Sequence, residues 1–188
     1  MKYLLNLSLI LCLVLFASCE KGNVELDNAG DEFLFVTIDE LRHDMPPRSM
    51  KLLELEKGAH KIVIQDKDGK NLEEDTFDVQ KGGLINAARH SYIIWTDLYW
   101  ASSYENSKLR ETKLQEEPLE IDGQEYIGEF EKLDADKLYL ESAWDYGLGE
   151  EFPASLWGLE FAQEKWSIKR KIFREKELAE AYMKLVKR

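Results

Sequence analysis

Cysteine is almost absent from this chain. Its 188 residues include only Cys12 and Cys19, so nothing beyond Cys19 can form a disulfide or offer a thiolate to a metal. The remaining length suits one ordinary domain or two small ones. Such a domain must be held together by its hydrophobic core alone.

Long apolar runs and positive charge are also scarce. No stretch after Cys19 is apolar for the roughly 20 residues that a membrane-spanning helix needs. The chain has 25 lysines and arginines against 37 acidic residues, and its formal net charge is −12. Phosphate backbones repel an acidic domain, so the composition argues against nucleic acid as a partner.

The common catalytic motifs are missing as well. The chain has no Gly-x-Ser-x-Gly elbow, no His-Glu-x-x-His pair and no phosphate-binding glycine loop. His43, His60 and His90 are far apart in sequence, and acidic residues are too frequent for any carboxylate pair to stand out. We therefore expect no catalytic residue, no metal and no cofactor. A hydrolase with an unrecognised carboxylate pair is the alternative.

The N-terminal stretch carries the most specific signal in the chain. Lys2 gives a positive start, residues 4–16 are mostly apolar, and the small residues Ala17 and Ser18 precede Cys19. A basic start, an apolar middle and an exit of small residues are typical of a secretory signal. The run is too short to favour a retained transmembrane helix.

The stretch ending at Cys19 resembles the lipobox of bacterial lipoproteins. Leu15, Ala17 and Ser18 stand where that pattern requires, although the residue between Leu15 and Ala17 is bulkier than usual. The resemblance implies a signal peptide over residues 1–18 and lipidation of Cys19. Acyl chains such as palmitate would then hold the protein on the cell envelope, at the outer membrane or cell surface rather than the inner membrane. Plain secretion and a retained anchor are the alternatives.

Residues 19–31 are polar, with Val24, Leu26 and Ala29 as apolar interruptions after Cys19. A stretch of this composition buries too little apolar surface to offset the entropy lost on ordering. We therefore predict a flexible tether between the lipid and the domain.

Residues 32–100 show short apolar runs separated by tight turns. The runs cover residues 33–38, 50–55, 60–65 and 76–79, with turns at Lys57-Gly58, Asp68-Gly69 and Gly82-Gly83. This spacing predicts a mainly β fold, an antiparallel β-sandwich or barrel-like domain. Residues 55–64, followed by Asp68-Gly69-Lys70, resemble the small β-sandwich modules of exported bacterial proteins. That resemblance implies a scaffold or spacer module.

Residues 91–100 form the most apolar stretch after the leader. Apolar side chains occupy both faces, so we predict a central strand. A buried carboxylate is costly unless it is hydrogen-bonded, so we expect Asp97 to lie near solvent at the end of this strand.

Residues 101–188 complete the predicted domain and pack on its first part. The pattern predicts an acidic hairpin around Asp122-Gly123, an irregular aromatic loop, a closing strand over 165–173 with basic residues outward, and a C-terminal α-helix.

The irregular loop, residues 139–161, holds the candidate ligand-binding residues Trp144, Tyr146 and Trp157. Binding groups often lie on loops held by a rigid frame, and exposed rings can stack on sugars while acids bond the hydroxyls. We expect that these rings mainly fill a core without disulfides. The sequence thus predicts an envelope scaffold or binding module that is not an enzyme, with glycan or peptide binding by this loop as the alternative.

Overall fold

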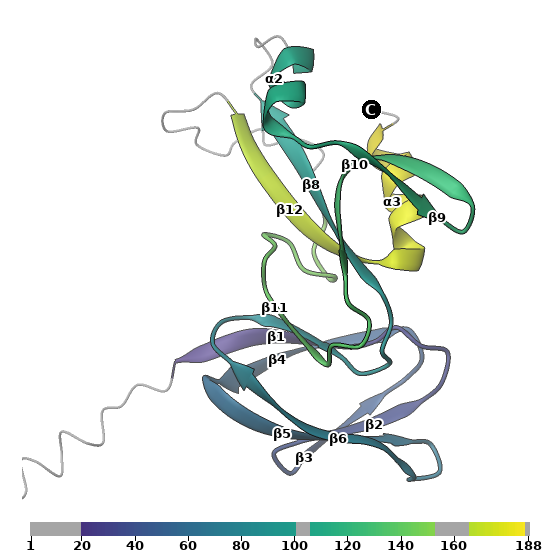
Figure 1. Ribbon diagram of the computed structural model, residues 1–188. Coiled ribbons are helices and arrows are strands. Elements are labelled where there is room, and N and C mark those ends of the chain that lie inside the picture. Colours follow the sequence, from purple (N-terminus) through teal and green to yellow (C-terminus); the bar gives the residue numbers. More distant parts are fainter. Residues whose placement is uncertain (1–19, 101–105, 153–165, 187–188) are drawn as a thin grey trace, which may run out of the picture.

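Twelve strands and two helices form the described part of the chain, which covers residues 20–100, 106–152 and 166–186 of the computed structural model (Figure 1). The strands make three open, four-stranded sheets in which most neighbours are antiparallel. The predicted fold class, mainly β with a C-terminal helix, is confirmed. Neither described helix is long and apolar enough to cross a membrane.

The middle sheet consists, in spatial order, of β11 (Tyr139–Glu141), β7 (Gly83–Asn86), β1 (Lys21–Asn28) and β4 (Ser49–Glu56). The outer sheet consists of β3 (Leu41–Met45), β2 (Leu34–Ile38), β5 (Gly58–Asp66) and β6 (Asn71–Val79). The C-terminal sheet consists of β12 (Trp166–Arg174), β8 (Tyr92–Trp100), β10 (Gln124–Leu133) and β9 (Glu117–Ile121). The helices are α2 (Asn106–Lys113) and α3 (Glu175–Val186).

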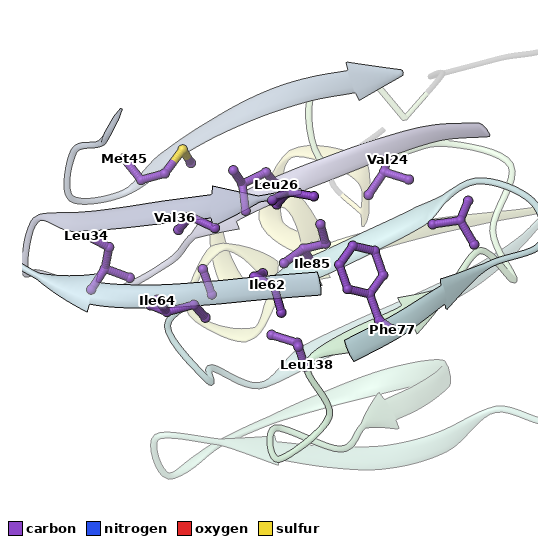
Figure 2. Packing of buried hydrophobic residues seen from close by; sticks show 13 residues of the cluster. Val24, Leu26, Leu34, Val36, Met45, Ile62, Ile64, Phe77, Ile85 and Leu138 are labelled. Atoms are coloured by element: carbon purple, nitrogen blue, oxygen red, sulfur yellow. The ribbon is translucent and has the colours of Figure 1, made fainter. Parts of the chain in front are cut away.

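The middle and outer sheets form a β-sandwich with one apolar core (Figure 2). Side chains alternate between the two faces of a strand, so Val24 and Leu26 of β1 point together toward Ile62 and Ile64 of β5. These four side chains are fully or almost fully buried. The second face of the middle sheet packs on the C-terminal sheet, where Leu84 joins the buried cluster of residues that includes Tyr92, Ile94, Leu140 and Ile172.

The predicted tether at residues 19–31 is wrong over most of its length. Lys21–Asn28 is β1, an inner strand that pairs antiparallel with β4 and parallel with β7. The polar residues around Val24 and Leu26 suggested disorder, because the groups that bond Glu25 and Asp27 come from elements far along the chain. Cys19 itself lies outside the described residues.

The predicted boundary at residue 100 does not separate two structural parts. β8 belongs to the C-terminal sheet, where it lies between β12 and β10, while β11 returns to the edge of the middle sheet. Residues 92–100 do form an inner strand, as predicted. The chain therefore passes three times between the middle and C-terminal sheets, and Leu140 of β11 packs with Tyr92 of β8.

An aromatic cluster fills the space between the C-terminal sheet and α3. Trp95 of β8 lies with its ring centroid 5.4 Å from that of Tyr182 and 5.7 Å from that of Phe152. Leu178 of α3 is fully buried in the same cluster. The helix docks as its amphipathic pattern predicts.

Asp97 does not lie at a solvent-facing strand end as predicted. It sits within β8, where Arg110 of α2 donates to its carboxylate at 2.8 Å. Burial raises the pKa of Asp97, although the Arg110 charge opposes that shift. No sequence pattern predicts this pair, since the region of α2 shows only polar composition.

Candidate functional site

A groove of about 400 Å³ runs between the second face of the middle sheet and the loop that follows β11. We call residues 142–150 the groove loop. The lining residues are Asn23 and Glu25 from β1, Met50 and Leu52 from β4, Gly82 before β7 and Gly83 at its start, and Ser142, Trp144, Asp145, Gly147, Gly149 and Glu150 from the groove loop.

Strand alternation produces the floor of the groove. Val24 and Leu26 point into the sandwich, so Asn23 and Glu25 must face the other way. Glu25 is paired with Leu52 in the register of β1 and β4. β4 is an edge strand, and Leu52 is 63% exposed there, so the floor ends in an open apolar rim.

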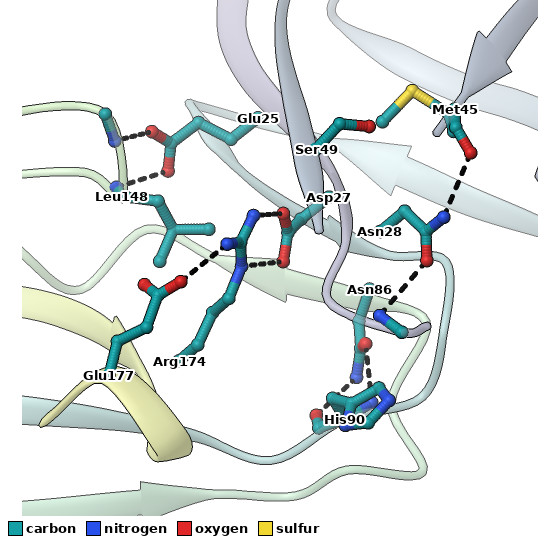
Figure 3. A network of polar contacts seen from close by, with 12 residues as sticks. Glu25, Asp27, Asn28, Met45, Ser49, Asn86, His90, Leu148, Arg174 and Glu177 are labelled. Atoms are coloured by element: carbon teal, nitrogen blue, oxygen red, sulfur yellow. Dashed lines mark hydrogen bonds and ion pairs between the residues drawn. The ribbon is translucent and has the colours of Figure 1, made fainter. Parts of the chain in front are cut away.

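Glu25 fastens the groove loop to the floor (Figure 3). Its carboxylate, 8% exposed, accepts hydrogen bonds from the backbone N–H of Leu148 at 3.0 Å and of Gly149 at 3.3 Å. Gly147 has no room for a side chain, because a Cβ there would collide with the Glu25 carboxylate. Because a buried carboxylate needs such donors, β1 and the loop hold each other in place.

A buried lysine supports the other side of the same loop. The Nζ of Lys171 on β12 donates to the backbone carbonyl of Gly147, and this side chain is 5% exposed. Burial lowers the pKa of Lys171, while Glu25 and Glu150 favour its charged form. The prediction that the basic residues of this strand face outward is therefore wrong for Lys171.

A second polar cluster joins β1 to the C-terminal sheet just beyond Glu25. The Asp27 carboxylate is fully buried and accepts a hydrogen bond from Tyr92 Oη at 2.5 Å. It also accepts from Arg174 Nε at 3.0 Å (Figure 3). Burial, together with the Asp27 charge, raises the pKa of Tyr92, so the phenol stays protonated and donates. Glu177 holds the far side of the Arg174 guanidinium at 2.7 Å.

Two buried asparagines extend this polar layer. Asn28 Nδ2 donates to the carbonyl oxygens of Met45 and Pro46, both at 3.0 Å. Asn86 Nδ2 donates to the carbonyl of His90 at 2.9 Å and that of Ala135 at 3.1 Å. Each amide donates to backbone carbonyls of other segments, so the layer helps to hold the frame on which the groove is built.

The two described ring residues that were predicted to bind ligand, Trp144 and Tyr146, pack in different clusters. Trp144 is half-buried, packs against the cluster around Tyr92 and also lines the groove. Tyr146 packs instead on Phe152, with ring centroids 5.9 Å apart, and does not line the groove. Trp157 lies outside the described residues. Of the candidates, the structure brings Trp144 to the groove.

The carboxylates of the groove serve the backbone. Glu150 accepts from the N–H of Gly147 at 2.6 Å, and Asp145 accepts from that of Arg170 at 2.9 Å. Together with Glu25, both carboxylates brace the loop rather than face one another as an acid–base pair. No lysine, arginine or histidine lines the groove within the described ranges, so the charged side chains of its lining are all acidic.

The histidines serve other parts of the fold. His60 contacts the Asp39 carboxylate at 2.5 Å and the Glu56 carbonyl at 2.7 Å. Within residues 20–100, 106–152 and 166–186, no group of three or more metal-ligating side chains comes together.

Sequence reasoning missed most of the groove. The sequence pattern places Asn23 and Glu25 in the predicted tether, and it marks the groove loop by its aromatic rings rather than by Gly147. One signal could have found the floor: Val24 and Leu26 are spaced as on a strand with one buried face, which puts Asn23 and Glu25 together on the other.

No protein-family model, curated protein or solved structure matches this chain.

Proposed function

We propose that this protein is a lipoprotein of the bacterial envelope, anchored through acyl chains on Cys19, that acts as a binding module and not as an enzyme. The sequence around Cys19 supports the anchor, and the groove supports the binding. The observation that carries the binding role is a groove of about 400 Å³ in which a half-buried indole, Trp144, meets an open apolar rim at Leu52.

A glycan fits this lining best. The faces of aromatic rings pack against the C–H groups of sugars, while carboxylate oxygens accept hydrogen bonds from sugar hydroxyls. Glu150 is exposed and uses one oxygen for Gly147. Among the described residues no donor is bonded to its other oxygen, which can accept from a ligand. Asp145, also exposed, lies beside Trp144 and lines the groove with it.

An extended peptide is the second candidate, favoured by the outer edge of β4, which no described strand covers. An unpaired edge can accept another strand through its backbone groups. Met50 and Leu52 of this edge line the groove, so a bound strand would place its side chains against the groove loop.

Binding is tested with the Trp144→Ala variant against glycan fragments and peptides from envelope extracts. We expect affinity to fall about tenfold or more, equal to about 1.4 kcal/mol. Trp166→Ala is the matched control, because Trp166 is on β12 and does not line the groove. If both variants bind with the affinity of the wild type, the groove is not the binding site. Thermal unfolding shows whether each variant remains folded.

Anchoring is tested with Cys19→Ser. We expect this variant to appear in the soluble fraction, whereas the wild type stays with the membrane. Membrane retention of Cys19→Ser would count against lipidation.

A further inference from the structure

The folded domain begins almost at the proposed lipid attachment. β1 starts at Lys21, so Glu20 alone separates it from Cys19. Consecutive Cα atoms are 3.8 Å apart, which places the Cα of Cys19 within about 8 Å of that of Lys21. Glu20 is itself held, because its carbonyl accepts from the N–H of Lys57 at 3.0 Å.

β1 enters the β-sandwich at one of its two ends, beside the turns that follow β4 and β6. A Cβ on Gly22 would lie 3.0 Å from the carbonyl oxygen of Lys81, so β1 runs tightly beside the turn after β6. Lys57, in the turn after β4, lies at the same end. We call the surface formed by Lys21, Lys57, Gln80 and Lys81 the entry end.

The opposite end of the sandwich is far away. β5 leaves the entry end at Gly58 and runs nine residues to Asp66, where a turn leads to β6. With a rise of about 3.4 Å per residue, that turn lies about 27 Å from the start of β5. Lys67 is exposed on this distant turn.

Each lysine of the entry end already has a carboxylate partner. Lys21 pairs with Glu54 at 3.8 Å, Lys81 pairs with Glu141 at 3.9 Å, and Lys57 pairs with Glu20. Paired charges give an anionic headgroup little to attract. Contact of this end with a bilayer therefore depends on the covalent anchor and not on lipid charge.

The groove lies close behind the entry end. Asn23 and Glu25 of its floor are four and six residues beyond Cys19 in the sequence. At the rise of a strand, their Cα atoms lie within about 14 Å and 20 Å of the lipidated residue.

We propose that acylated Cys19 holds the domain directly on the bilayer, with the entry end against the lipid headgroups and the groove opening beside the membrane surface. This inference rests on the proposed lipidation. Its partner is the lipid surface itself, and it differs from a tethered domain, which would turn freely above the membrane.

The test compares two labelled positions in the acylated, full-length mature protein. In that form Cys19 is capped by lipid, so Gln80→Cys at the entry end and Lys67→Cys at the distant turn can each carry one fluorophore. The protein is placed in vesicles whose headgroups carry a nitroxide quencher. We expect quenching to be several-fold stronger at position 80 than at position 67, and the same in phosphatidylcholine vesicles with or without phosphatidylglycerol.

A spacer supplies the control. Twenty glycine and serine residues inserted between Cys19 and Glu20 have a root-mean-square length of about 25 Å and should remove the difference between the two positions. Mass spectrometry first establishes whether Cys19 is acylated. If it is, equal quenching at both positions in the protein without the spacer overturns the placement of the domain but leaves the lipoprotein assignment standing. A bare thiol at Cys19 overturns both. If quenching is stronger at position 80 than at position 67 only when anionic lipid is present, the contact depends on lipid charge and not on the covalent anchor, which also overturns the proposal.

Discussion

Asp27 and Arg174, 147 residues apart in sequence, form an ion pair whose carboxylate is fully buried. Arg174 donates from Nε at 3.0 Å and from Nη2 at 2.5 Å. Burial disfavours the charged guanidinium, but the bonds to Asp27 outweigh it and raise the pKa of Arg174. The pair therefore joins β1 to β12 with charge-assisted bonds, across the contact between the middle and C-terminal sheets.

Removal of the arginine should be strongly destabilising. Arg174→Met leaves the Asp27 carboxylate buried without its counter-charge, which costs about 3–5 kcal/mol. Urea unfolding measures this loss. Lys184→Met is the control, because Lys184 pairs with Glu180 on the exposed side of α3 and its loss should leave the midpoint unchanged. Similar midpoints for Arg174→Met and Lys184→Met would contradict the role given to the buried pair.

The conformation of the groove loop should depend on the absence of a Cβ at Gly147. Gly147→Ala puts a methyl group where the Glu25 carboxylate lies, so it should break the bonds to Leu148 and Gly149 and cost about 1–3 kcal/mol. Thermal unfolding and limited proteolysis of the loop measure the effect. Gly149→Ala is the matched control, since its Cβ would meet only the flexible end of Met50. An equal loss in both variants would show that Glu25 is not the reason for the glycine.

Stability should fall with rising pH through the titration of His60. Burial disfavours the protonated ring, but the Glu56 carbonyl and the Asp39 carboxylate together raise the pKa of His60. Both neighbours accept hydrogen bonds, so the doubly protonated imidazolium fits between them. Since the unfolded pKa is about 6.5, the stabilisation is complete below that pH and is lost as the pH rises through the folded pKa above it.

The difference between wild type and His60→Gln isolates this contribution. Burial lowers the pKa of His43, with Lys51 adding to the shift, so His43 acts with the opposite sign in both proteins and cancels. Urea midpoints between pH 5 and pH 9 should converge for the two proteins as the pH rises. A gap that stays constant across this range would show that the ion pair with Asp39 contributes nothing.

The hairpin between β2 and β3 should gain stability from a glycine. Asp39 and Glu40 both have positive φ, of 47° and 79°, which side chains disfavour. Glu40→Gly should therefore raise the free energy of unfolding by about 0.5–1 kcal/mol. Gly123→Ala is the reciprocal change, because Gly123 has a φ of 77° in the hairpin between β9 and β10, and it should lower the stability. Thermal midpoints that move in the same direction would refute this account of the turns.

Local patterns in the sequence predicted much of the fold. The pair Asp122-Gly123 marks the hairpin of β9 and β10, and the change of period after Arg174 marks α3. Each of these features depends on neighbours within a few residues, which is why a sequence window contains the necessary information. The hairpin at Asp39-Glu40 was missed because it lacks the glycine that signals such a turn.

Other features depend on contacts between residues that are far apart in the sequence, so no short stretch of sequence contains both partners. Residues 19–31 read as a tether because Glu25, Asp27 and Asn28 are polar. Their burial depends on hydrogen-bond partners that lie from 17 to 147 positions away in the sequence. Trp144 and Tyr146 are two residues apart, yet the packing of separate clusters assigns one to the groove and the other to the core.

The sequence by itself determined the mainly β class, the tight turns at glycine, the C-terminal helix and the excess of negative charge. The strands, turns and helix follow from side-chain periodicity and backbone preference, which depend on residues close together in the sequence. The negative charge follows from the composition of the whole chain. Only the tertiary structure decided that β1 is an inner strand and that a groove opens beside it. The physical reason is that a polar side chain can be buried only where hydrogen-bond or charge partners surround it. The partners of β1 come from Arg174, Lys171 and the groove loop, which lie beside this strand only in the folded chain.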